Sequence, residues 1–271
     1  MSGHIMSRIG QRNARTVAHE RAPRAVVGYT QDYPDGYATE PHSHRRAQLL
    51  YTLSGVLRVA TEDARYAIPP GTGLFIPAAL SHAVRMDGPV AMRALFLRPD
   101  AARVAPPRVT VIAVSPLLRE LILAACAEPL DWDLKGRGRH LAALALDEIA
   151  RAPSLPLAVP VPRDPRLARL AARLRAHPEE ARSLDLLAAE AGASVRTLAR
   201  LFRRETGMSF QQWRRQFRLT EAVALLAAGA TPARAAASVG YASTPAFGAA
   251  IRAAFGVTPG GLRAQGSAPR R

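Results

Sequence analysis

Short apolar and β-branched runs separated by turn residues occupy residues 24 to 98 of the chain. Gly, Pro, Asp and Ser interrupt the runs at short intervals. This pattern predicts short antiparallel strands joined by turns, and the strands are expected at 48–53, 56–60, 74–76 and 91–97. Residues 20–105 are therefore predicted to form a β domain.

From residue 115 the apolar spacing changes to that of helices. Ser115 and Pro116 suit an N-cap and a first helical position, and apolar residues then recur on one side up to residue 127. A second helix is predicted at 139–151, and the two helices form a helical region, 106–152. Five prolines between residues 153 and 165 predict a semi-rigid linker, 153–165, before a last domain, 166–271.

Two segments of the last domain share one spacing. A serine is followed by apolar residues four and eight positions later and by a glycine thirteen positions later, which predicts a capped helix that ends at a left-handed residue. A shorter capped helix and a turn at a glycine precede each one, at 183–191 and 231–239. In the first segment the turn glycine is Gly192, and the long helix has Ser194, Leu198, Phe202 and Gly207 at the four spaced positions. In the second segment the turn glycine is Gly240, and the four positions are Ser243, Phe247, Ile251 and Gly256.

Two helices joined by a tight turn, twice over, predict a doubled helix-turn-helix. Between the units, residues 209–228 contain neither Gly nor Pro. A helix of about 20 residues is about 30 Å long, close to one DNA turn. The two second helices, 194–206 and 243–255, are therefore expected to enter successive segments of the major groove of double-stranded DNA.

The charge of the chain agrees with a polyanionic partner, either nucleic acid or a membrane surface. The formal net charge is +16, and residues 166–271 hold 17 basic and 6 acidic residues. A helical protein-interaction domain with a solvated basic face is the alternative to DNA binding. The predicted contacts are Arg196, Thr197, Arg200, Arg203 and Arg204 on the first recognition helix, and Thr244, Pro245, Gly248, Ala249 and Arg252 on the second.

The two recognition helices are expected to contribute differently. Arginine can bridge guanine O6 and N7 or bind phosphate, so the first unit is predicted to read bases. The second helix carries mostly small residues, which predicts phosphate contacts and shape fit.

The residues of this domain resemble the AraC/XylS family of transcription regulators. The resemblance covers about residues 183–263 and implies a bipartite DNA-binding domain that acts near promoters. Ile251 and Leu262 stand where the family has aromatic residues, and both keep apolar character. The matching residues are 188–198, Arg200, Leu201, Phe202, Gly207, Trp213, Arg218, Leu219, 239–243, Ala246, Phe247, 255–259 and Arg263.

The N-terminal domain carries two histidine motifs, Gly36-x5-His42-x-His44-x3-Gln48-x6-Gly55 and Gly71-x5-Pro77-x-Ala79-x2-His82. In a strand, residues i and i+2 point to the same side, so His42 and His44 could present two imidazoles into one barrel. Together the motifs resemble those of the cupin superfamily, a small antiparallel β-barrel. The run 42–58 resembles in particular the AraC subgroup named after NimR.

The cupin resemblance implies four metal ligands: His42, His44, Gln48 and His82. Gln48 stands where metal-binding cupins have Glu, Ala79 replaces a Gly, and Met86 replaces an Asn. Three imidazoles and an amide oxygen suit one divalent transition metal, Zn, Ni, Cu or Fe(II). The alternative is that the histidines line a pocket without metal.

Three functions follow from these motifs. The first is a transcription regulator, an activator or a repressor, whose barrel senses a small molecule or a metal ion. The second is a cupin metalloenzyme fused to a DNA-binding module, and the third is a constitutive DNA-binding protein with a dimerising barrel. The nearby carboxylates, Asp35, Glu40, Glu62 and Asp63, form no catalytic arrangement in the sequence, so no enzyme and no catalytic residue is expected.

The expected architecture is α+β with two domains: an antiparallel cupin-like β-barrel with helices, then an all-α double helix-turn-helix. The helices at 115–127 and 139–151 are candidates for a homodimer interface or for packing on their own barrel. A single cysteine, Cys126, excludes an internal disulfide. No apolar run reaches a membrane span and no signal peptide is evident, so a cytoplasmic location without membrane contact is expected.

Overall fold

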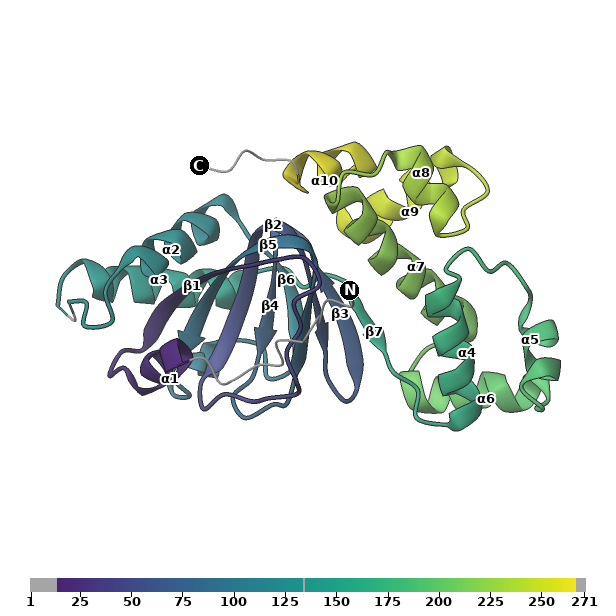
Figure 1. Ribbon diagram of the computed structural model, residues 1–271, viewed down its shortest axis with the longest axis horizontal. Coiled ribbons are helices and arrows are strands. Elements are labelled where there is room, and N and C mark those ends of the chain that lie inside the picture. Colours follow the sequence, from purple (N-terminus) through teal and green to yellow (C-terminus); the bar gives the residue numbers. More distant parts are fainter. Residues whose placement is uncertain (1–13, 134, 267–271) are drawn as a thin grey trace, which may run out of the picture. The chain divides into compact units, whose positions relative to one another are not determined.

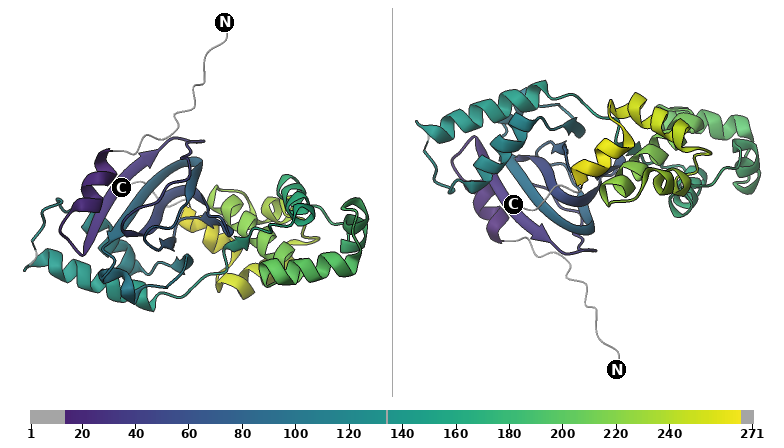
Figure 2. Two further views of the ribbon diagram at one scale, coloured as in Figure 1. Left: turned by 90° about the horizontal axis from the view of Figure 1, so that it is seen from below. Right: turned by 90° about the horizontal axis from the view of Figure 1, so that it is seen from above.

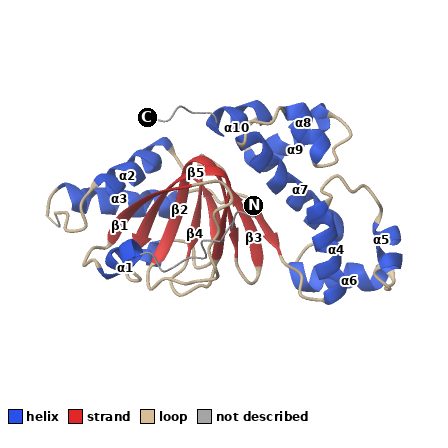
Figure 3. Cartoon of the chain, viewed as in Figure 1, coloured by secondary structure: helices blue, strands red, loops and turns tan. Residues whose placement is uncertain are grey.

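The computed structural model describes residues 14–133 and 135–266 and divides them into two compact units. The first contains residues up to 61 and 68–154, and the second contains residues 62–67 and those from 155 on. Long strands lie in the first unit, whereas helices make up most of the second (Figure 3). The expected α+β, two-domain class is confirmed.

The first unit is built on an antiparallel sheet that is curved in Figure 1. Its strands pair in the order β1-β5-β2-β4-β6. Closure into a cupin-like barrel stays a prediction. The strands are β1 (Val26–Tyr33), β2 (Ala47–Ala60), β4 (Thr72–Ile76), β5 (Ala83–Leu97) and β6 (Thr110–Ala113).

The strands predicted at 48–53 and 56–60 form one long strand, β2, with a register shift between Thr52 and Val56. Gly55 lies in this irregular stretch with a φ of +75°, and a Cβ there would lie 2.4 Å from the Pro89 carbonyl oxygen. The glycine that separated the two predicted strands is therefore a bulge within a continuous pairing with β5, and it does not end the strand.

Helices cover this sheet. α2 (Pro116–Ala127) contacts β1 and β5, and α3 (Arg137–Arg151) packs against α2, an arrangement that both views of Figure 2 show. The Ser115 hydroxyl accepts a hydrogen bond from the Leu118 amide at 3.0 Å, as the N-cap prediction requires. The apolar side of α2, including Leu118 and Ile122, is fully buried in the cluster beneath it. A short helix, α1 (Ala14–Arg21), and a 3-10 turn, η1 (Ala101–Val104), complete the unit.

The second unit contains a short strand pair and seven helices among its described residues. β3 (Ala64–Ile68) pairs antiparallel with β7 (Ala158–Pro160), which lies in the segment expected as a linker. The Trp213 indole donates a hydrogen bond to the Pro160 carbonyl at 2.8 Å. The helices are α4 (Pro165–Ala176), α5 (Leu184–Glu190), α6 (Val195–Thr206), α7 (Phe210–Ala227), α8 (Pro232–Ser238), α9 (Thr244–Phe255) and α10 (Pro259–Gly266).

The predicted caps of the two recognition helices are present. Ser194 and Ser243 each accept a hydrogen bond from the amide three residues later, at 3.2 and 3.3 Å. Gly207 and Gly256 end the helices in left-handed conformation, with φ of 69° and 71°. The doubled helix-turn-helix is thus α5–α6 and α8–α9, joined by α7. No helix in the described part of the chain is both long and apolar enough to cross a membrane.

Candidate functional site

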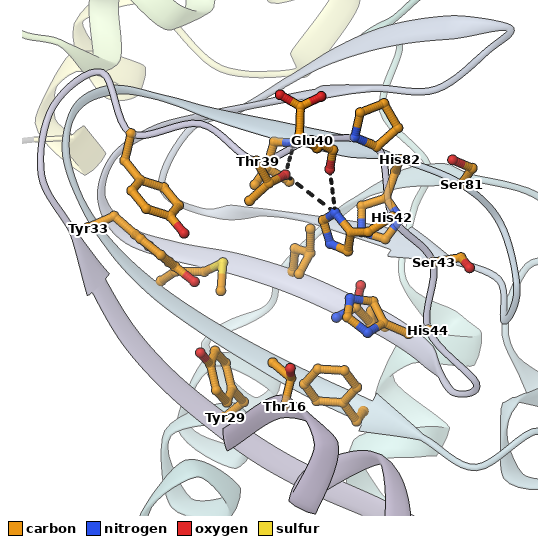
Figure 4. Close-up of a pocket in the computed structure, with 17 residues that line it drawn as sticks. Thr16, Tyr29, Tyr33, Thr39, Glu40, His42, Ser43, His44, Ser81 and His82 are labelled. Atoms are coloured by element: carbon orange, nitrogen blue, oxygen red, sulfur yellow. Dashed lines mark hydrogen bonds between the residues drawn. The ribbon is translucent and has the colours of Figure 1, made fainter. Parts of the chain in front are cut away.

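A cavity of about 510 Å³ opens in the first unit. Its lining comes from β1, β2, β5, the segments around residues 37–44 and 81–84, and Thr16 of α1. In Figure 4 the histidines lie at one end of this cavity, and Tyr29 and Tyr33 lie toward the other. The cavity therefore joins a polar, nitrogen-rich end to an aromatic one.

His42, His44 and His82 meet at the polar end. Their ring centroids are 4.5 Å apart for His42 and His82, 5.0 Å for His42 and His44, and 5.6 Å for His44 and His82. One ring nitrogen from each lies within 4.8 Å of the others. The backbones of His42 and His82 exchange hydrogen bonds of 2.9 and 2.8 Å, so a single β-bridge joins the two sequence motifs.

Ala79 holds the second motif in place next to this bridge. Its amide donates to the His44 carbonyl at 2.8 Å, and its φ is 63°. Among the described residues it is the one non-glycine with a positive φ. This backbone conformation explains why glycine is expected at that position in the cupin motif.

All three rings are oriented by hydrogen bonds at Nδ1. The acceptors are the Glu40 carbonyl at 2.9 Å for His42, the Glu20 carboxylate at 2.6 Å for His44, and the Leu80 carbonyl at 3.1 Å for His82. Carbonyl and ionised carboxylate oxygens only accept, so each Nδ1 carries the hydrogen. The acceptor lone pair of each neutral ring is then on Nε2, which is the tautomer of a metal-ligating histidine.

Two further observations describe the chemistry of this end of the cavity. Gln48 is buried, and its Oε1 has no hydrogen-bond partner among the described residues. Burial lowers the pKa of His82 to about 4, so that ring is neutral at pH 7. A buried amide oxygen without a donor, in the lining of the same cavity as three imidazoles, fits a cation or a donor group of a ligand.

The aromatic end of the cavity is neutral. Tyr33 and Tyr37 pack at a centroid distance of 4.7 Å, and burial raises the pKa of Tyr33 well above its usual value. Leu50, Met92 and Phe96 add apolar surface to the same lining. This end suits the apolar or aromatic part of a small molecule.

One residue of the site has no signal in the sequence motifs. Glu20 lies on α1, 24 positions before His44, and its carboxylate holds that ring. A second cavity of about 450 Å³ lies on the α1 side and shares His42 and His44 with the first. Neither the helix nor the contact could be found from the spacing of the histidines.

The carboxylates considered for catalysis do not gather at the site. Glu40 is the one of the four that lines the cavity. Asp35 accepts a hydrogen bond from the Gly88 amide at 2.8 Å, and Glu62 and Asp63 bind Arg163 at 2.8 and 2.7 Å.

The predicted DNA contacts lie on two helices of the second unit. The residues proposed on α6 and α9 are exposed except for Thr197, which is half-buried, and Gly248, which is buried. Arg196, Arg200 and Arg203 form no ion pair with a carboxylate in the described part of the chain, whereas Arg204 pairs with Glu205 at 3.0 Å. α6 therefore presents three uncompensated guanidinium groups.

Several acidic residues elsewhere in this unit form ion pairs with neighbouring arginines. Arg173 binds Glu190 at 2.9 Å, Arg182 binds Glu180 at 2.7 Å, and Arg166 binds Asp164 at 2.8 Å. The Arg166 guanidinium lowers the pKa of Asp164 to about 2. α6 itself carries four arginines and one acidic residue, Glu205, so its charge stays positive, which favours a phosphate-bearing partner.

Comparisons with known proteins agree with both units. The family model described as AraC-like ligand binding domain matches residues 24–194, and the one described as helix-turn-helix domain matches residues 187–265. The chain is 32% identical over 242 residues to the HTH-type transcriptional regulator NimR of Escherichia coli, covering 89% of this chain and 88% of that protein.

Two partial matches concern smaller segments. The HTH-type transcriptional regulator RipA of Corynebacterium glutamicum is 38% identical over 109 residues, which cover 40% of this chain and 32% of RipA. A solved structure of an AraC-type regulator from Chromobacterium violaceum is 31% identical, covers 39% of this chain and 96% of that one, and has a TM-score of 0.36.

The two curated relatives are named as transcriptional regulators, in agreement with the expectation that the chain is not an enzyme. The match to the ligand-binding model spans more than half of the chain, and the match to NimR spans nearly all of it. The chain belongs to the AraC family of transcriptional regulators, with an N-terminal ligand-binding domain and a C-terminal DNA-binding helix-turn-helix domain.

Proposed function

We propose that this regulator senses a divalent transition metal ion in the cavity of its first unit, alone or together with a small molecule. The ligands would be Nε2 of His42, His44 and His82, with Oε1 of Gln48. The observation that carries the proposal is the convergence of three rings, each donating from Nδ1, in a cavity that is also lined by Gln48, whose buried Oε1 has no described partner. This donor set suits Zn, Ni, Cu or Fe(II).

A dication bound there would bring a charge that four neutral ligands do not cancel. An anionic or polar group of a small molecule can complete the coordination, while its apolar part contacts the tyrosines at the other end. The volume of about 510 Å³ suits a ligand of ordinary metabolite size. The effector acts as a switch if it binds the DNA-competent and incompetent states with different affinity.

The output of the switch is DNA binding through α6 and α9. Arg196, Arg200 and Arg203 of α6 support base reading, because arginine can bridge guanine O6 and N7. α9 offers small side chains and one exposed arginine, Arg252, which supports phosphate contact and close approach. α7, which joins the two helix-turn-helix motifs, has 18 residues and is about 27 Å long.

We propose a homodimer as the form that binds DNA, with α2 and α3 at the interface. Leu117 on α2 is 50% exposed and Leu144 on α3 is 48% exposed, and both are large apolar side chains. A dimer doubles the DNA contacts and suits repeated half-sites.

The metal proposal is tested by elemental analysis and native mass spectrometry of the purified full-length protein. We expect one transition metal ion per chain, and its loss in the His42→Ala/His44→Ala double variant. The matched control is His140→Ala/His177→Ala, which removes two exposed histidines and should keep the metal. Stoichiometric metal retained in the first variant would place the site elsewhere. A wild-type protein that takes up no ion would leave a purely organic effector or constitutive DNA binding.

A further inference from the structure

We propose that Glu20 of α1 is a positioning residue for the metal site, and that metal binding and the seating of α1 on the cavity favour each other. The inference rests on the metal proposal above and adds a residue from outside both histidine motifs.

The contact between Glu20 and His44 is short and largely shielded from water. Glu20 Oε1 accepts from His44 Nδ1 at 2.6 Å, and the side chains are 17% and 11% exposed. The other oxygen, Oε2, accepts from the Arg45 amide at 3.3 Å. With both oxygens held, the carboxylate fixes the plane of the His44 ring and leaves Nε2 as the nitrogen that can bind a metal ion.

Glu20 is the only charged acceptor among the three that orient the rings, because His42 and His82 donate to backbone carbonyls. A carboxylate behind an imidazole makes the ring a stronger metal ligand. It also places a negative charge next to a ligand set that has none, since Gln48 stands at the position of the expected carboxylate. Glu20 thus supplies the negative charge that Gln48 lacks, although it acts on the ion through the His44 ring and does not contact it directly.

The C-terminal end of α1 and the segment that follows it are held by Arg46, the residue just before β2. Arg46 is 4% exposed, and its guanidinium donates to the carbonyls of Glu20 at 3.0 Å, Arg24 at 2.7 Å and Ala22. His19 of α1 contacts Tyr29 in the cavity wall at a centroid distance of 5.1 Å. α1 therefore contacts both ends of the cavity, and its seating reaches the metal ligand His44 through one hydrogen bond.

Because coupling between two binding events is reciprocal, an ion that strengthens the His44–Glu20 hydrogen bond also stabilises the seated α1. Metal affinity should then depend on Glu20, and protection of the α1 backbone amides from hydrogen exchange should depend on bound metal. If Glu20 had only a packing role, its replacement would not change metal affinity, and metal would protect the α1 amides equally in wild type and variant.

The test measures Zn²⁺ and Co²⁺ affinity of the full chain by competition with a chromophoric chelator. We expect Glu20→Ala to weaken affinity about 10–100-fold, as loss of an outer hydrogen-bond partner does at other metal sites. Glu20→Gln keeps an acceptor of the same size but loses the charge, so its metal affinity should lie between those of wild type and Glu20→Ala. Glu120→Gln, an exposed helical glutamate of the same unit, is the control and should match wild type.

The second readout is hydrogen exchange of the α1 amides with and without Zn²⁺. Zn²⁺ should slow exchange in wild type and have little effect in Glu20→Ala. Equal affinities of wild type and both Glu20 variants would overturn the role of Glu20 while leaving the metal site intact. Absence of binding by wild type would overturn the metal proposal and this inference with it. Should Glu20→Ala fail to fold, as judged by circular dichroism, Glu20→Gln decides the matter.

Discussion

The two turn glycines of the doubled helix-turn-helix offer a matched pair of substitutions, Gly192→Ala and Gly240→Ala. Both glycines are left-handed, with φ of 65° and 74°. A Cβ on Gly192 would meet nothing within 4 Å, whereas a Cβ on Gly240 would lie 2.8 Å from the Glu179 carbonyl oxygen and 2.6 Å from Arg218 Nη2. The sequence motif is the same at both turns, and the surroundings are not.

The left-handed conformation costs alanine about 1–2 kcal/mol, and reduced freedom of the unfolded chain offsets about 0.4–1 kcal/mol of that. Gly192→Ala should therefore lower the free energy of unfolding by about 1 kcal/mol. At Gly240 the methyl group also meets backbone, which adds the cost of overpacking, about 1–3 kcal/mol. Gly240→Ala should lower the free energy of unfolding by about 2–4 kcal/mol.

The flexible end of Arg218 cannot simply move away from that methyl group. Its guanidinium is half-buried and donates to the carbonyls of Pro178 at 3.1 Å, Glu180 at 2.9 Å and Gly240 at 3.2 Å. Burial also lowers the pKa of Arg218, which indicates how far the group is removed from water. Displacing it would leave these half-buried carbonyls without this donor.

The assay is urea unfolding of the full chain followed by the fluorescence of Trp213, which is 1% exposed in the second unit. Trp132 lies in the first unit, so all variants are made in a Trp132→Phe background. Circular dichroism confirms that each variant is folded without denaturant. Equal losses at the two glycines, or a larger loss at Gly192, would refute the reasoning from local crowding.

Three further substitutions have expected outcomes. Arg200→Ala should weaken binding to the preferred site by about 1–3 kcal/mol and relax base preference, whereas Arg252→Ala should weaken binding to all sequences alike and flatten its salt dependence. Binding-site selection with a salt titration distinguishes them, and unchanged specificity of Arg200→Ala would reject its role as a base reader. Leu117→Asp should shift the protein from dimer to monomer in analytical ultracentrifugation, with Leu186→Asp, at a leucine on α5 that is also exposed, at 57%, as the control. A wild-type monomer, or a dimer that survives Leu117→Asp, would contradict an interface at α2.

Features that depend on a few neighbouring residues were predictable from the sequence. Ser115, Ser194 and Ser243 cap helices because the hydroxyl reaches an amide three residues later, whatever the rest of the chain does. Gly207 and Gly256 end their helices for an equally local reason, the left-handed backbone. Periodicity also placed α2, α3 and the exposed arginines of α6, although β2 appeared as two strands because the glycine bulge resembles a turn.

The candidate metal site was predictable in part. The spacing of His42, His44 and His82 indicated a shared site, and the structure brings the three rings together. The spacing could not reveal that all three rings donate from Nδ1, because two of the acceptors are backbone carbonyls, which every residue has. It could not reveal Glu20 either, since that carboxylate reaches His44 from a helix 24 residues away.

Sequence alone thus determined the family, the two-domain α+β class and the helix-turn-helix repeat, because caps, turns and amphipathic faces are properties of short segments. Only the tertiary structure decided which long-range partners each segment meets. It joined two histidine motifs by a bridge, set a glutamate behind one imidazole and left Gln48 Oε1 without a described partner. It also made Gly240 crowded and Gly192 open, because packing depends on residues distant in the chain that no local pattern specifies.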